Sequence, residues 1–183
     1  MRLALVAVVV FLSSTASAVA LDTKSPLATF EAISQRAKVA AHVRVLYQTH
    51  RLVAEGKEAG RIVTDSHCEV LEAAFGASQG DTLVITTLGG YYGNIGQKVF
   101  GLERLVPNEE LAVFLDAPGY MDGGLRVTGM NLGLYRVVDA PSLETRERPI
   151  IGHGSSVFPA RDDPTPLTLG DFLARAKLAR SGR

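Results

Sequence analysis

The sequence predicts a mainly β fold, in which five to six short antiparallel strands form a small barrel or sandwich with a short helix at each end. Short apolar segments recur at near-regular spacing between residues 39 and 138, separated by turns rich in Gly and Pro. The first two segments alternate apolar and polar residues, which is typical of half-buried strands. With 46% hydrophobic residues and zero net charge, the 183-residue chain is apolar enough to form one compact core.

The helix expected first covers residues 25–37, because Ser25 can cap it and Pro26 suits its first position. A strand follows from Val39, with a turn over residues 54–60 and a second strand over residues 61–71. The first strand carries apolar residues on one face and polar residues on the other. The expected polar face of this hairpin holds His42, Arg44, Gln48 and His50 from one strand and Asp65, His67 and Glu69 from the other.

The later elements are read from turn residues and short apolar runs. A third strand is expected over residues 81–88, a strand over 111–115, and a final hairpin from 125–130 and 134–138. Residues 140–166 carry five of the eight prolines and predict an irregular tail. A C-terminal amphipathic helix is expected over residues 167–180, packed on the barrel or bound to a partner through an apolar stripe. That stripe consists of Leu169, Phe172, Leu173 and Ala176.

The first 20 residues have the layout of a secretory signal peptide. Arg2 precedes an apolar run from Leu3 to Leu12, and small residues follow, with two A-x-A cleavage patterns ending at Ala18 and Ala20. The run is shorter than the roughly 20 apolar residues that a membrane-spanning helix needs. The sequence therefore predicts a protein that is exported to the periplasm or secreted, with no stable membrane span in the mature chain.

Charge and cysteine content exclude further classes. Lys plus Arg and Asp plus Glu each number 19, so the basic excess of a nucleic-acid-binding module is absent and no nucleic acid partner is expected. The single cysteine, Cys68, has no partner for an intramolecular disulfide. Because Cys68 falls on the apolar side of a predicted strand, we expect it to be buried.

A series of segments in order resembles a family of uncharacterised exported bacterial proteins, over roughly residues 29–138 and the terminal helix. The segments are Val39–Val45 with a helix before it, Gly60–Asp65, Glu69–Leu71, Gly80–Thr82, Gly89–Gly90, Ile95–Gly101, Leu111–Leu115, Arg126–Gly129 and Leu134–Val137. The resemblance implies an OB-like five-stranded barrel over residues 21–139, similar to the netrin or metalloprotease-inhibitor module. The chain departs from the family at Pro107–Glu110, and it lacks the cysteine pairs on which the animal inhibitors depend.

A glycine-rich stretch, Gly89–Gly101, is the first candidate binding site. It matches no phosphate-binding motif and predicts a long hairpin loop or a bulged strand corner. Adjacent tyrosines offer stacking area at low entropy cost, so Tyr91, Tyr92 and Asn94 are the candidate ligand-binding residues. One of the two tyrosines is expected to face the core, because neighbouring strand positions point to opposite faces.

A weaker candidate is a metal site on the first hairpin. With the turn centred near residue 57, we expect His50 roughly opposite Asp65 and Gln48 roughly opposite His67. Imidazole and carboxylate groups on one face are suitable zinc ligands, so His50, Asp65 and His67 form the candidate set. The alternative is a solvated polar face with no metal, since no HExxH motif is present.

No sequence pattern indicates catalysis. Residues 153–156, His-Gly-Ser-Ser, lack a G-x-S-x-G elbow, and the adjacent acids Glu109 and Glu110 are typical of a solvated turn. We therefore expect a non-catalytic exported module, without a cofactor, that binds a protein or glycan partner. The alternatives are an inhibitor or partner of an exported metalloprotease and, more weakly, a metal-dependent enzyme.

Overall fold

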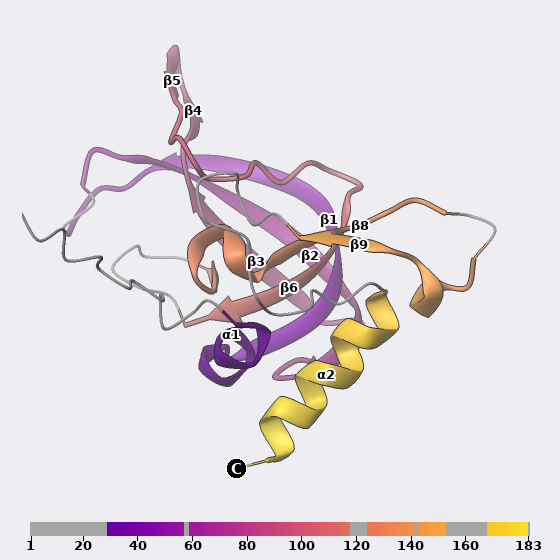
Figure 1. The fold of residues 1–183 in the computed structure, drawn as a ribbon. Helices are drawn as coiled ribbons and strands as arrows, with labels where there is room; N and C mark the ends of the chain where they lie inside the picture. Colours follow the sequence, from indigo (N-terminus) through magenta and orange to yellow (C-terminus); the bar gives the residue numbers. More distant parts are fainter. Residues whose placement is uncertain (1–28, 57–58, 118–123, 141–142, 153–167, 183) are drawn as a thin grey trace, which may run out of the picture.

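The fold is mainly β with two α-helices, as the sequence predicts (Figure 1). The computed structural model describes residues 29–56, 59–117, 124–140, 143–152 and 168–182. The predicted signal peptide, residues 1–20, lies outside these ranges. The main sheet is antiparallel, with strand order β3-β2-β1-β6-β8-β9, and β7 is a second partner of β6. Its strands are β1 (Val39–Leu52), β2 (Ile62–Phe75), β3 (Thr82–Leu88), β6 (Glu110–Asp116), β7 (Arg126–Val127), β8 (Leu134–Val137) and β9 (Ile150–Gly152).

The long β1–β2 hairpin is confirmed, but its polar face is not continuous. Val45 pairs with Cys68 and Tyr47 pairs with His67, so Leu46 is an extra residue in β1. Such a bulge reverses the alternation of side chains along the strand. Before the bulge, the odd-numbered residues Val43 and Val45 face the aliphatic core. After it, the even-numbered residue Gln48, which pairs with Ser66, faces that same side of the sheet. The expected polar face is therefore divided between the two sides of the sheet.

Two later predictions are corrected by the strand pairing. The segments expected to form a final hairpin do not pair with each other: β7 and β8 both pair with β6, at different positions along it. A 3-10 helix, η1 (Met130–Gly133), separates them. Within the Pro-rich stretch expected to be irregular, residues 150–152 form β9, which pairs with β8. A second 3-10 helix, η2 (Thr145–Glu147), precedes β9.

Closure of the sheet into an OB-like barrel stays a prediction. The strand path begins at β3 and ends at β9, which do not pair. One isolated parallel bridge joins Ile85 of β3 to Leu125, just before β7, through backbone hydrogen bonds of 2.7 and 2.9 Å. A single bridge brings the two ends of the β3-β2-β1-β6-β7 path together without forming a strand pair.

The core has two main parts, one on each side of the central strands. One part is aliphatic and includes Val43, Val70, Leu111 and Cys68. Cys68 is buried as predicted, and its burial raises the pKa of the thiol to about 12. The other part lies under the two helices and is rich in aromatic rings.

The helices cover one end of the sheet, and they begin at threonine caps. α1 (Phe30–Arg36) is capped by Thr29, whose side chain accepts from the backbone N–H of Ala32, and the expected cap Ser25 lies outside the described residues. α2 (Leu169–Ser181) is capped by Thr168, which accepts from the backbone N–H of Asp171. The predicted apolar stripe of α2 is buried against the sheet. Among the described residues, no helix has the length and apolar character needed to cross a membrane.

Candidate functional site

The glycine-rich stretch folds as a small separate hairpin that projects from the body, at the end opposite the two helices (Figure 1). It consists of β4 (Gly90–Tyr92) and β5 (Ile95–Gln97), joined by Gly93 and Asn94. Gly93 has φ +57°, a conformation that glycine adopts without strain and that two-residue hairpin turns need at their first central position.

Hydrogen bonds between backbone and side-chain groups attach this hairpin to β2. The backbone N–H of Gly89 donates to the carbonyl of Ile62 at 2.8 Å, and the backbone N–H of Ile62 donates to Oε1 of Gln97 at 2.7 Å. An isolated two-stranded hairpin is at best marginally stable in water. These contacts therefore give the projecting strands a fixed base on the main sheet.

Four large apolar side chains are exposed on or beside the hairpin: Tyr91 at 59%, Tyr92 at 50%, Ile95 at 65% and Phe100 at 88%. We call these four residues the hairpin surface. The prediction that one tyrosine faces the core is wrong, because β4 and β5 form a two-stranded sheet outside the main core. Asn94 is also exposed, at the turn.

A pocket of about 540 Å³ lies at the base of the hairpin, and Tyr91 contributes to its wall together with Thr64, Thr87, Lys98 and Arg104. The ring of Tyr91 lies over Gly96, where an added Cβ would come within 3.0 Å of it. Glycine at position 96 thus lets the ring lie flat on β5.

His50 lies beside this pocket, with its ring edge-on to Tyr91 at 6.3 Å between centroids. Its Nδ1 lies 2.9 Å from Oγ1 of Thr64, and that hydroxyl donates to the carbonyl of Gly89 at 2.7 Å. Because the single hydroxyl proton goes to Gly89, Nδ1 of His50 carries a proton and donates to Thr64.

Two cations pack on the aromatic rings at this site. Nζ of Lys98 lies 5.7 Å from the centre of the Phe100 ring, and the guanidinium of Arg104 lies 5.9 Å from that of Tyr91. Cation–π contacts at exposed positions contribute about 0.5–1 kcal/mol each. Neither Lys98 nor Arg104 has a carboxylate partner among the residues that the structure describes.

The residues predicted to hold a metal are not brought together. Leu52 pairs with Ile62, so the residue opposite His50 is Thr64 and not Asp65. In the same register, His67 lies opposite Tyr47 and not Gln48. Adjacent residues of a strand point to opposite faces, which separates His50 from Asp65. Within the described ranges, no group of three His, Cys, Asp or Glu side chains is arranged to hold a metal ion.

Asp65 and His67 have partners of their own. Asp65 is buried and accepts from the Thr86 hydroxyl and from Nε of Arg51, each at 2.6 Å. The His67 ring stacks on Tyr47 with centroids 4.2 Å apart and an interplanar angle of 12°. Both side chains therefore serve contacts within the β1–β2–β3 part of the sheet.

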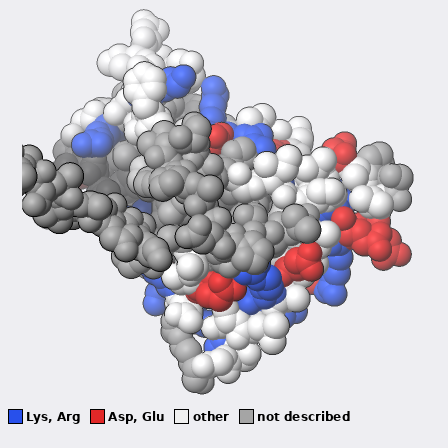
Figure 2. Space-filling model, viewed as in Figure 1, with Lys and Arg blue, Asp and Glu red and all other residues white. Residues whose placement is uncertain are grey.

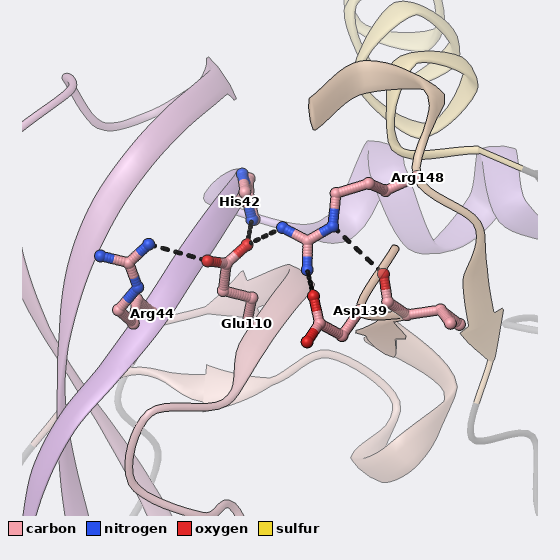
Figure 3. Close-up of polar contacts among 6 residues, drawn as sticks. His42, Arg44, Glu110, Asp139 and Arg148 are labelled. Atoms are coloured by element: carbon pink, nitrogen blue, oxygen red, sulfur yellow. Dashed lines mark hydrogen bonds and ion pairs between the residues drawn. The ribbon is translucent and has the colours of Figure 1, made fainter. Parts of the chain in front are cut away.

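A buried polar cluster that the sequence did not indicate lies on the helix-covered face (Figure 3). Glu110 of β6 accepts from Nε2 of His42 at 3.0 Å, from Nη2 of Arg44 at 2.8 Å and from Nη1 of Arg148 at 2.5 Å. Nε of Arg148 also donates to the carbonyl of Val138 at 3.1 Å. The expectation that Glu110 belongs to a solvated turn is thus corrected: its carboxylate joins β1, β6 and the segment before β9.

The protonation of this cluster follows from its burial. Burial lowers the pKa of His42 below its ordinary 6.5, against the opposing effect of the Glu110 carboxylate. Burial alone would raise the pKa of Glu110, but Arg44 and Arg148 hold it below its usual range. The carboxylate is therefore charged and His42 is neutral near pH 7, with Nε2 donating to Glu110. Nδ1 of His42 has no partner among the described residues.

Only three-dimensional pairing reveals this cluster. His42 and Glu110 are 68 positions apart, and Arg148 is another 38 residues along the chain. A polar residue at position 42, within an otherwise apolar run from Val39 to Val43, was the available signal, because buried polar residues need a partner. The segment at residues 153–156, weighed above for hydrolysis, lies outside the described residues.

Comparison of the chain with family models, curated proteins and solved structures gave no match. The resemblance to a family of exported bacterial proteins therefore stays a prediction from the residues quoted above.

Proposed function

We propose that this protein is an exported, non-catalytic binding module that holds a protein partner through the hairpin surface and the pocket at its base. The observation that carries the proposal is the exposure of four large apolar side chains, at 50% to 88%, around one projecting hairpin. Grouped exposed apolar residues are typical of interaction sites, and aromatic residues are enriched among those that dominate binding energy.

The attachment of the hairpin supports the same proposal. Hydrogen bonds to Ile62 fix the base of β4 and β5, so that less conformational entropy is lost when a partner binds. A protein partner fits this surface better than a glycan. Tyr91 and Tyr92 point to opposite faces, and the Tyr91 ring already lies on Gly96 and near Arg104, so the pair forms no open flat platform for a sugar.

Export is a separate part of the proposal and rests on residues 1–20. We expect the mature protein, isolated from its native cells, to begin after Ala18 or Ala20. N-terminal sequencing tests this directly. Recovery of protein that begins at Met1, in the cytoplasmic fraction, would contradict export.

Site-specific crosslinking in the native cells tests the binding surface. A photo-crosslinking amino acid at Tyr92 is expected to form an adduct with one protein partner, identified by mass spectrometry. The control is the same group at Leu178, which is 70% exposed on α2. Adducts that form equally from both positions, or from neither, would contradict the proposal. An exported metalloprotease in the adduct would support the narrower alternative that the family resemblance suggests.

A further inference from the structure

The described wall of the pocket beneath the hairpin carries two positively charged side chains, Lys98 and Arg104. Three charged side chains contribute to its wall: Lys98, Glu103 and Arg104. Nη2 of Arg136 lies 3.7 Å from the carboxylate of Glu103, so this acid already has a cationic partner. The charged groups of Lys98 and Arg104 lie near aromatic rings and form no ion pair with a described residue. Within the described part of the chain, the pocket therefore offers two cations that no carboxylate neutralises.

Apolar side chains border the same two cations. Lys98 lies against Phe100 and Arg104 lies against Tyr91, so each positive group stands next to an exposed ring. A cation held on an aromatic face keeps its charge while its position is restricted, which favours a specific contact with an incoming anion. The two cations and the two exposed rings together are complementary to a segment in which acidic and apolar side chains alternate.

The hollow beneath the hairpin is also extended. A second hollow of about 270 Å³ shares Thr87, Leu88, Leu102 and Glu103 with the first, so the two adjoin along β3. A chain in an extended conformation fits adjoining hollows of this kind better than a compact small molecule does. In Figure 2, the projecting hairpin is largely free of charge, with Lys and Arg atoms near its base.

From these observations we propose that the partner presents an acidic peptide segment, whose carboxylate enters the pocket between Lys98 and Arg104 while apolar neighbours contact the hairpin surface. This inference rests on the proposed function and specifies the chemistry of its partner. Charge complementarity of this type contributes mainly to specificity and to the rate of association.

Retention of peptides on the purified mature protein provides the test. One library of short blocked peptides carries Asp-Glu at its centre with random neighbours, and a second carries Asn-Gln at the same positions. We expect the acidic library to be retained about tenfold better, which corresponds to about 1.4 kcal/mol. The preference should shrink between about 0.15 M and 1 M salt, as the Debye length falls from about 8 to about 3 Å.

Three double variants assign the effect to the pocket. Lys98→Gln/Arg104→Gln is expected to abolish the preference for the acidic library, and Lys98→Arg/Arg104→Lys is expected to retain it. Lys38→Gln/Lys177→Gln removes the same amount of charge from exposed positions outside the pocket and is expected to leave the preference unchanged. Circular dichroism confirms that each variant is folded.

Several outcomes would overturn the acidic segment. The first is equal retention of the two libraries. The second is a loss of the preference for the acidic library in Lys38→Gln/Lys177→Gln as large as that in Lys98→Gln/Arg104→Gln. The third is stronger binding of an oligogalacturonate than of any peptide. Crosslinking from Tyr92 distinguishes failure of the acidic segment from failure of the binding surface. An unchanged adduct in Lys98→Gln/Arg104→Gln would overturn the acidic segment and leave the binding surface standing, whereas failure to crosslink in the unaltered protein would overturn the binding surface itself.

Discussion

Aromatic side chains gather at two ends of this protein, and they are buried at one end and exposed at the other. Under the helices, the rings of Phe30, Phe114, Tyr135 and Phe172 pack against one another with centroids 4.7 to 6.5 Å apart. None of the four is more than 1% exposed. Aromatic pairs of this kind contribute about 0.5–1.5 kcal/mol beyond the burial of their surface.

At the hairpin end, residues of the same chemical type remain in solvent. Tyr91, Tyr92 and Phe100 are 50% to 88% exposed, and Tyr91 and Phe100 each lie near a cation. Their contacts add little to the free energy of folding. Aromatic residues are thus used in two ways: those at the helix-covered end stabilise the fold, and those at the hairpin end stay exposed, as the proposed binding surface requires.

The largest expected effect is at the helix-covered end. Phe172→Ala should lower the free energy of unfolding by about 3–5 kcal/mol, because it leaves a cavity among three other rings. Urea denaturation measures the change. Leu178→Ala, at a position on the same helix that is 70% exposed, is the control and should stay within about 0.5 kcal/mol. A loss below about 1 kcal/mol in Phe172→Ala would contradict a stabilising role for the buried aromatic rings.

The polar cluster is expected to give the next largest effect. Glu110→Gln removes the charge shared by His42, Arg44 and Arg148 and should cost about 2–3 kcal/mol, since hydrogen bonds to charged groups are the strong ones. Glu144→Gln, an exposed substitution in the same part of the molecule, should have almost no effect. Equal urea midpoints for the two variants would show that the cluster does not hold the segment before β9 to the sheet.

The buried His42 is expected to make the free energy of unfolding depend on pH. Because the pKa of His42 is lowered in the folded protein, the unfolded chain takes up the proton first as the pH falls. The free energy of unfolding should therefore be fully retained above about pH 6.5 and decrease as the pH falls below it, towards the folded pKa. Urea denaturation at several pH values across this range gives the free energy of unfolding as a function of pH. That free energy should fall less steeply with decreasing pH in His42→Gln than in His67→Gln. Identical slopes would contradict a neutral buried His42.

The smallest expected effect on stability is at the hairpin surface. Tyr92→Ala/Ile95→Ala should change the free energy of unfolding by no more than about 0.5 kcal/mol, because both side chains are at least 50% exposed. Thermal unfolding followed by circular dichroism measures it. A loss of several kcal/mol would mean that these residues serve the fold, and the contrast between the two ends would disappear.

Sequence patterns predicted most of the elements, because local alternation and turn residues determine where strands begin and end. The two strands of the long hairpin, the buried Cys68 and the apolar stripe of α2 follow from such patterns. The divided polar face did not follow, since one extra residue at Leu46 reverses the side-chain alternation without any change in composition. The strand β9 was also missed, because its pairing with β8 is a tertiary contact within a Pro-rich stretch.

The candidate site was predicted in part. Tyr91, Tyr92 and Asn94 were identified from their setting among glycines, but the exposure of both tyrosines depends on β4 and β5 forming a hairpin outside the main core. His50 was a weak candidate for a metal ligand, and the structure places it beside Tyr91, because its partner on β2 is Thr64. A shift of one residue in register was enough to change its neighbours, and spacing alone does not fix register that closely.

The most direct test of the central claim is the affinity of the crosslinked partner, once purified, for two forms of the mature protein. Isothermal titration calorimetry compares the unaltered protein with Tyr92→Ala/Ile95→Ala. If the hairpin end is the binding surface, the variant binds at least about 100-fold more weakly, a loss of about 2.8 kcal/mol typical of interface hot spots, while its Tm is unchanged. Equal affinities in two equally stable proteins would contradict the claim.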